Sequence, residues 1–359
     1  MSEHLTVKNT NERIQYIDAL RGFTMILVVF AHVETFGFFN FEYETFVGRL
    51  FQSFRMPLFF FISGYISYKK DEKFSINTTL RLAARKIRVQ ITPTLIFGLA
   101  YTYLVLRSTW DAFLYQPQKY GYWFTVSLLE MYLIYYFVRT ISYYYEKILK
   151  TTKDLCSVLL LIIASIMFLT KSYFAEGMPL ERIGALACLN ETFRYFHFFV
   201  IGLLASKYNK LFIRVINNRI VITIFVILFV LFMSLQYEAG QSRVLNTLFE
   251  VVPRYSSLFL VFLFFYKYQN TFLNTNILGM SLQYVGKRTL DIYMLHYFCL
   301  PYLPSFGNFL KLYPNFVIEL FVGILLAMMI VGVCLIISSV LRLSPILSFI
   351  LFGVRIKKM

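Results

Sequence analysis

Residues 317–337 read VIELFVGILLAMMIVGVCLII, a run in which Glu319 is the only charged residue. About 20 apolar residues in a helix are enough to cross the hydrocarbon core of a bilayer, which is about 30 Å thick. Shorter runs of the same kind occur at 158–169 (VLLLIIASIMFL) and 220–233 (IVITIFVILFVLFM). Inside lipid every backbone polar group must be hydrogen-bonded within the protein, and these runs lack the alternation typical of barrel strands. The sequence therefore predicts an all-α integral membrane protein.

Apolar runs extend over most of the chain, of which 58% is hydrophobic and only 15% is charged. They predict about ten transmembrane helices, at 17–39, 47–68, 89–107, 122–141, 154–172, 190–206, 220–237, 250–268, 284–304 and 315–341. With the N-terminus in the cytoplasm, 25 of the 35 lysine and arginine residues fall at the inner side, Arg21 included. This bias follows the positive-inside rule and predicts that both termini are cytoplasmic. Topology thus accounts for the net charge of +16, and we expect the lipid bilayer, not nucleic acid, as a partner.

The polar segments between these runs are too short for a separate soluble domain. We predict a cytoplasmic N-terminal segment at 1–16, a ten-span domain at 17–341 and a cytoplasmic tail at 342–359. The protein would be a multi-pass protein of the inner or plasma membrane. We see no internal repeat that would support an inverted-repeat transporter. The four cysteines show no metal-ligand spacing, and we predict no metal site.

Two polar residues in the first predicted span stand out, because ionisable groups at membrane depth are costly and are candidates for function. Arg21 and His32 are eleven residues apart, which places them within about 20° of each other on one helix face and about 16 Å apart along the axis. Arg21 would lie near the inner surface and His32 near the midplane. An imidazole there can act as a general base on a hydroxyl. A buried histidine that only hydrogen-bonds a neighbouring helix is equally compatible with the spacing.

Other ionisable or aromatic residues reach a similar depth. His197 and His296 lie in the sixth and ninth predicted spans. Glu130 lies mid-span in the fourth, seven residues after Trp123. An inter-helix hydrogen bond is the structural alternative for Glu130, and a place in the interfacial aromatic belt is the alternative for Trp123.

The segment at 69–88 is strongly basic, and topology and contact with anionic lipid account for most of its charge. Arg85 and Arg88 differ because they share a helix face just before Pro93, where proline can start or kink the next span. A pair of guanidinium groups at this point could bind a phosphate-bearing ligand from the cytosol.

These residues resemble membrane acyltransferase family 3, the integral-membrane O-acyltransferases of surface polysaccharides and related glycans. Five motifs in the family's order carry the resemblance: residues 16–22 (YIDALRG) with His32, an Arg-x10-His pattern; 56–65 (MPLFFFISGY); 85–88 (RKIR) before Pro93; 122–124 (YWF); and 286–296 (GKRTLDIYMLH). The chain departs from the family at Arg55, where members often have histidine, and at Thr94, where many have tyrosine after the proline. These departures leave the identity of the acceptor open.

The resemblance implies transfer of an acyl group, usually acetyl, from cytosolic acyl-CoA to a hydroxyl of a sugar or glycan. His32 would then be the general base, Arg21 would hold the donor or orient the site, and Arg85 with Arg88 would bind the phosphates of coenzyme A. The residues expected to bind substrate or support the site are Trp123, Glu130, Ser63, Tyr293 and His296, of which Trp123, Ser63 and Tyr293 are candidates for stabilising the oxyanion.

Three alternatives remain, one of which is a non-catalytic partner in an envelope-assembly complex. Covalent catalysis through an acyl-histidine is compatible with the same residues. In another class of function, the chain would be a transporter or exporter of a glycan or lipid-linked intermediate, with the same mid-membrane residues lining its path.

Overall fold

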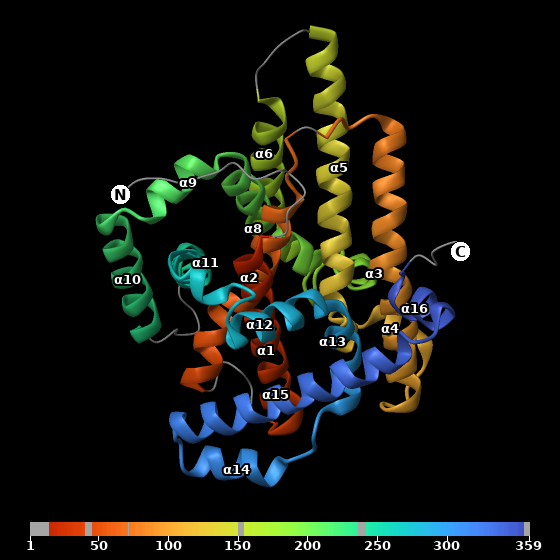
Figure 1. The fold of residues 1–359 in the computed structure, drawn as a ribbon, viewed down its shortest axis with the longest axis vertical. Coiled ribbons are helices and arrows are strands. Elements are labelled where there is room, and N and C mark those ends of the chain that lie inside the picture. Colours follow the sequence, from red (N-terminus) through yellow and green to blue (C-terminus); the bar gives the residue numbers. More distant parts are fainter. Residues whose placement is uncertain (1–13, 40–44, 71, 150–153, 236–241, 355–359) are drawn as a thin grey trace.

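A computed structural model describes residues 14–39, 45–70, 72–149, 154–235 and 242–354, and these ranges contain helices and no strand (Figure 1). The parts of the predicted terminal segments at 1–13 and 355–359 lie outside the described residues. The longer helices are α1 (Gln15–His32), α2 (Phe46–Ser67), α3 (Ile76–Leu104), α5 (Trp123–Leu149), α6 (Leu155–Thr170), α8 (Leu189–Lys207), α10 (Arg219–Ser234), α11 (Arg243–Lys267), α12 (Ile277–Lys287) and α15 (Phe316–Leu341). The shorter ones are α4 (Trp110–Tyr115), α7 (Glu181–Ala187), α9 (Asn209–Ile216), α13 (Thr289–Leu295), α14 (Pro304–Leu312) and α16 (Pro345–Phe352).

Each of the ten ranges predicted to cross the membrane contains a helix, which confirms the all-α class. Five described helices are long and apolar enough to cross a bilayer by themselves, or six if α9 and α10, which are bent by 67°, form one broken span. The total of ten spans and the cytoplasmic position of the termini stay predictions.

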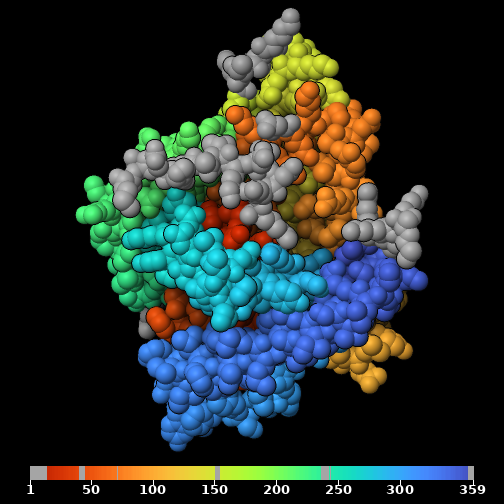
Figure 2. Space-filling view, in the orientation of Figure 1, coloured from red at the N-terminus to blue at the C-terminus, as the bar shows by residue number. Residues whose placement is uncertain are grey.

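The helices form a bundle with α1 and α2 at its centre (Figure 1). Figure 2 shows the two N-terminal helices only as a small area, because α12 and α15 cover them on this face. At the edge of the bundle lies α10, in which no residue is buried, as expected for a helix that faces lipid.

A close backbone crossing joins α1 to α12. A Cβ added at Gly22 would lie 1.9 Å from the carbonyl oxygen of Leu282, and one added at Gly286 would lie 1.8 Å from that of Asp18. Only glycine allows such an approach, and small residues at helix contacts are typical of membrane proteins. The crossing therefore fixes how α1 and α12 sit against each other.

A second crossing of the same kind joins α2 to α8. Cβ atoms added at Gly64 and Gly202 would lie 2.0 Å from the carbonyl oxygens of Phe199 and Phe61, respectively. The central helices are thus anchored on two sides by paired glycines.

Two local features add detail to the sequence-based expectation. Helix α3 begins at Ile76, where the Ser75 side chain accepts a hydrogen bond from the Thr78 backbone N–H, and it continues through Pro93. Pro93 therefore does not start this helix. The C-terminal tail also folds back, because Phe352 of α16 stacks on Phe97 of α3 with ring centroids 6.1 Å apart.

We expect Gly286→Ala to lower the stability of the protein by about 1–3 kcal/mol, the usual cost of overpacking a tight contact. Gly332→Ala in α15 is the matched control, since a Cβ there meets nothing within 4 Å. Thermal unfolding in detergent, followed by the loss of monodisperse protein, measures both. Equal melting temperatures for the two variants would contradict a close crossing at Gly286.

Candidate active site

Two histidines from distant parts of the sequence meet inside the bundle. Nδ1 of His32 lies 2.7 Å from Nε2 of His296, and the two rings stack with centroids 4.9 Å apart and planes at 15°. His296 is fully buried, whereas His32 keeps partial exposure. His32 is therefore the member of the pair that a reactant can reach.

The backbone determines which nitrogen of each ring carries a proton. Nδ1 of His296 lies 3.1 Å from the carbonyl oxygen of Ile292, which can only accept, so this nitrogen is the donor. In the neutral ring Nε2 of His296 is then an acceptor, and Nδ1 of His32 donates to it. The remaining nitrogen of His32, Nε2, is left with its lone pair available as a base.

A hydroxyl already faces this lone pair. The Tyr297 hydroxyl lies 3.2 Å from Nε2 of His32, at a distance where it can donate a weak hydrogen bond. Tyr297 is buried among Tyr101, Tyr122 and Tyr293, with ring centroids 4.8–6.4 Å away. The Tyr297 hydroxyl marks a direction from which a substrate hydroxyl could approach the base.

The backbone changes at the end of α1, where His32 lies. The chain continues from His32 as a π-helical turn, Val33–Gly37, before the described segment ends. Such turns are rare and are often found at functional sites, because they re-aim the side chains beside them.

A buried arginine lies close to this pair. Arg55 of α2 is 8% exposed, and it lies within the range over which its charge contributes to the electrostatic environment of His32 and Tyr297. It occupies the position where the sequence departs from the family resemblance. The structure thus places a cation near the base.

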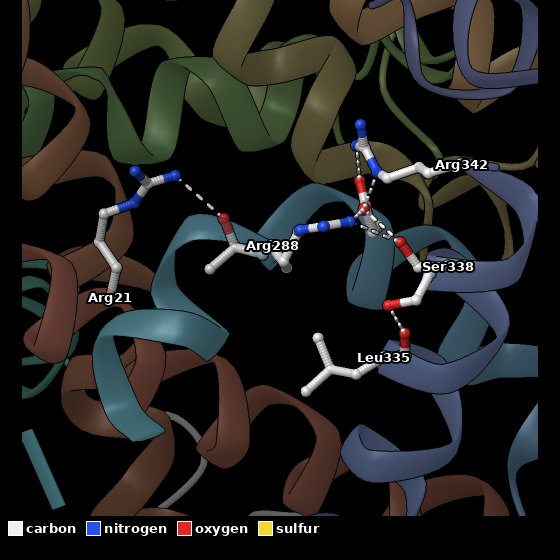
Figure 3. Close-up of polar contacts among 8 residues, drawn as sticks. Arg21, Arg288, Leu335, Ser338 and Arg342 are labelled. Carbon is white, nitrogen blue, oxygen red and sulfur yellow. Dashed lines mark hydrogen bonds and ion pairs between the residues drawn. The ribbon is translucent and has the colours of Figure 1, made fainter. Parts of the chain in front are cut away.

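Arg21 and His32 face the same neighbour, as their spacing predicted. Nη2 of Arg21 donates to Oγ1 of Thr289 at 3.0 Å, at the start of α13 (Figure 3). Nη1 of Arg21 also lies 3.8 Å from the Asp18 carboxylate. Thr289 and His296 belong to one continuous segment, so the polar face of α1 lies along α13 from one end to the other.

Beyond Thr289 a second polar cluster ties α13 to α15 (Figure 3). The buried Asp291 carboxylate accepts hydrogen bonds from Nε and Nη2 of Arg342 at 2.8 and 2.7 Å, in a bidentate arrangement. Ser338 and Arg288 also donate to it, at 2.5 and 3.2 Å. This cluster fixes the segment that carries His296.

The structure separates the two arginines predicted to bind coenzyme A. Arg85 lines a cavity of about 250 Å³ together with Lys69 and Lys86. The ammonium of Lys86 lies 3.3 Å from the ring centroid of Tyr132, at the wall of the same cavity. Arg88 is not among the lining residues, and its carbonyl oxygen lies against Gly353 after α16.

The other predicted residues are spread along the bundle. The Tyr293 hydroxyl donates to the carbonyl of Gly121 and accepts from the Phe124 backbone N–H, so both of its hydrogen-bonding roles are used. Trp123 stacks on Tyr195 with centroids 5.7 Å apart.

Glu130 and the remaining histidine are held by inter-helix hydrogen bonds. The Thr192 hydroxyl donates to Glu130 at 2.5 Å, so Glu130 makes the inter-helix hydrogen bond that was its structural alternative. Nδ1 of His197 lies 2.5 Å from the Tyr255 hydroxyl, apart from the His32 pair. The Ser63 side chain is partly exposed in α2.

Sequence reasoning missed Tyr297 and the role of Arg55. Tyr297 directly follows His296, but a tyrosine among 27 carries no distinguishing signal. In the sequence Arg55 is distinguished only as a departure from the family motif, and this does not show that it is buried. Among the described residues, no group of three or more His, Cys, Asp or Glu side chains is placed to hold a metal ion.

Residues 14–341 match a family model described as an acyltransferase domain. Since the match covers nearly the whole chain, the protein belongs to acyltransferase family 3, as the motifs indicated. Comparisons with curated proteins and with solved structures gave no match. The protein is thus a helical membrane protein of an acyltransferase family.

We expect Asp291→Asn to destabilise the protein by about 3 kcal/mol, because breaking a buried ion pair leaves charges without compensation. A double-mutant cycle tests this. It compares the thermal unfolding of Asp291→Asn, Arg342→Gln and the double variant. The double variant should be less destabilised than the two single effects together, since both remove the same contact. Additive effects would show that the pair contributes nothing.

Proposed function

We propose that the protein is a membrane O-acyltransferase that moves an acyl group, acetyl in the simplest case, from acyl-CoA to a hydroxyl of a sugar or glycan. The observation that carries the proposal is the His32–His296 pair, which leaves Nε2 of His32 as a base beside a hydroxyl. Membership of an acyltransferase family supports the reaction type. We further propose that the protein acts in the inner or plasma membrane.

In the proposed reaction Nε2 of His32 takes the proton of the acceptor hydroxyl as its oxygen attacks the thioester carbonyl. The bond from the carbonyl carbon to sulfur breaks, and the coenzyme A thiolate receives the proton from His32. His296 is a positioning residue, because its acceptor nitrogen orients the base and stabilises the imidazolium that forms. Arg55 and the Tyr297 hydroxyl are the groups beside His32 suited to stabilise the oxyanion.

The donor would enter through the cavity lined by Arg85, Lys69 and Lys86, whose three cations outnumber the one carboxylate there, that of Glu72, and would bind the phosphates of coenzyme A. The pantetheine arm would extend from there towards His32. Arg21, eleven residues before His32 on α1, would then help to hold the donor or orient the site.

We expect His32→Ala to reduce acyl transfer by about 100-fold or more, the usual contribution of a positioned general base. Labelled acetyl-CoA and isolated membranes measure the transfer. His296→Gln should retain more activity than His296→Ala, because its side-chain carbonyl can accept from Nδ1 of His32. In the parent protein and in the His296 variants, which keep His32, kcat/KM should rise with pH to a plateau, since only the neutral imidazole accepts a proton.

Full transfer by His32→Ala would exclude this base. A deletion strain complemented with the same variant distinguishes an acyltransferase from an exporter when both surface glycan and its acylation are measured. Loss of surface glycan with unchanged acylation per sugar unit would favour export.

We expect Arg85→Gln to raise the KM for acetyl-CoA by about tenfold, the effect of losing one charge-assisted hydrogen bond. Arg88→Gln should raise it less, because Arg88 does not line the cavity. Arg81→Gln, at an exposed position of the same helix, is the matched control. Equal effects of Arg85→Gln and Arg81→Gln would place the donor elsewhere.

A further inference from the structure

Three basic side chains surround one carboxylate where α6, α8 and α11 meet. Glu250 of α11 pairs with Lys171, with Arg194 at 3.2 Å and with Arg254 at 2.7 Å. The side chains of Lys171 and Arg254 are each 17% exposed, and that of Arg194 is 38% exposed. We call these four residues the Glu250 cluster.

The Glu250 cluster carries more positive than negative charge. Within these four residues one carboxylate faces three cations, a net charge of +2, and the Lys171 ammonium and the Arg254 guanidinium also lie over the rings of Phe168 and Tyr195. Charges removed from water are costly unless they are compensated, so an anion from outside would lower this cost. Arginine forks match the geometry of phosphate oxygens, and Arg194 keeps enough exposure to meet one.

Aromatic rings connect the Glu250 cluster to the histidine pair. The guanidinium of Arg254 lies 5.8 Å from the ring centroid of Tyr195, on which Trp123 stacks at 22° between planes. The Tyr195 ring also stacks on Phe60, with centroids 5.3 Å apart. Flat, half-buried rings of this kind offer apolar faces to the C–H face of a sugar.

The row of rings continues to the base. Phe60 contacts Phe124 at 5.0 Å between centroids, and Phe124 contacts Tyr293 at 5.5 Å. Tyr293 in turn lies 5.9 Å from His296, the partner of His32. Phe60, Tyr293 and His296 are buried, so this part of the row is packed interior. An elongated ligand with an anionic end on the Glu250 cluster would instead have to follow the partly exposed Trp123 and Tyr195 towards His32.

We infer that the Glu250 cluster is a subsite for a phosphate group of the acceptor, with Trp123 and Tyr195 as the platform for the adjoining sugar. The inference rests on the proposed function and names the acceptor class as a phosphorylated or phosphate-linked glycan. The cluster is separate from the donor cavity, which is lined by residues of α2, α3 and α5 and the segment between α2 and α3.

Binding of inorganic pyrophosphate to purified protein in phosphatidylcholine nanodiscs tests the subsite. The chain has two tryptophans, so Trp110→Phe leaves Trp123 as the only fluorescent indole, beside the subsite. We expect a saturable change in Trp123 fluorescence at constant ionic strength. Arg194→Gln and Arg254→Gln should each weaken binding by tenfold or more, and Arg182→Gln, outside the cluster, should not.

The same variants separate a binding role from a structural one. Because each removes a surplus cation and leaves Glu250 paired, their melting temperatures without pyrophosphate should stay close to that of the parent. A lowered melting temperature with unchanged pyrophosphate affinity would overturn the inference. In the transfer assay Arg194→Gln should raise the KM for the acceptor by about tenfold and leave the KM for acetyl-CoA unchanged.

Two further experiments identify the source of the phosphate and distinguish the subsite from the proposed acyltransferase activity. Nanodiscs containing phosphatidylglycerol should leave pyrophosphate binding unchanged, whereas competition would assign the cluster to a lipid headgroup and overturn its role for the acceptor. His32→Ala should bind pyrophosphate normally. Loss of activity only in His32→Ala, with no pyrophosphate binding in any variant, would overturn the subsite and leave the acyltransferase proposal standing.

Discussion

The glycine crossing between α1 and α12 is the constraint on which the site depends. Gly22 and Gly286 each precede a histidine of the pair by ten residues, and the two segments run in the same direction. Once the backbones touch at the glycines, Arg21 meets Thr289 and His32 meets His296. A side chain at either glycine would separate the helices, and with them the two rings. The geometry of the histidine pair is thus set by a contact that contains no polar side chain.

Two carboxylates of the bundle are paired between helices. Asp291 joins α13 to α15 through Arg342, and Thr192 joins α8 to α5 through Glu130. In lipid such contacts replace the water that a soluble protein would supply. They join neighbouring helices with opposite charges or neutral donors, whereas the four residues of the Glu250 cluster carry a net charge of +2. The Asp291 and Glu130 contacts are thus structural, whereas the surplus charge of the Glu250 cluster suits an anionic ligand.

The sequence predicted the helical class, the family and the face shared by Arg21 and His32, because apolar length and a 3.6-residue period are local properties. It could not show that His296 is the partner of His32, since 264 residues separate them. It also grouped Arg85 with Arg88, because spacing along a helix says nothing about which residue faces a cavity. The role of Arg55 depends on how α2 packs against α1, which no local pattern encodes.

The hydrogen bond from His296 to the Ile292 carbonyl limits how many protons the histidine pair can take up. This hydrogen bond occupies Nδ1 of His296, and the contact between the rings occupies Nε2 of His296 and Nδ1 of His32. Only Nε2 of His32 can therefore take up a further proton. The pair therefore stores a single proton at a time. In the proposed reaction each turnover must release that proton with the thiol before the next acceptor can be activated, so alcohol deprotonation and thiol release are stoichiometrically linked.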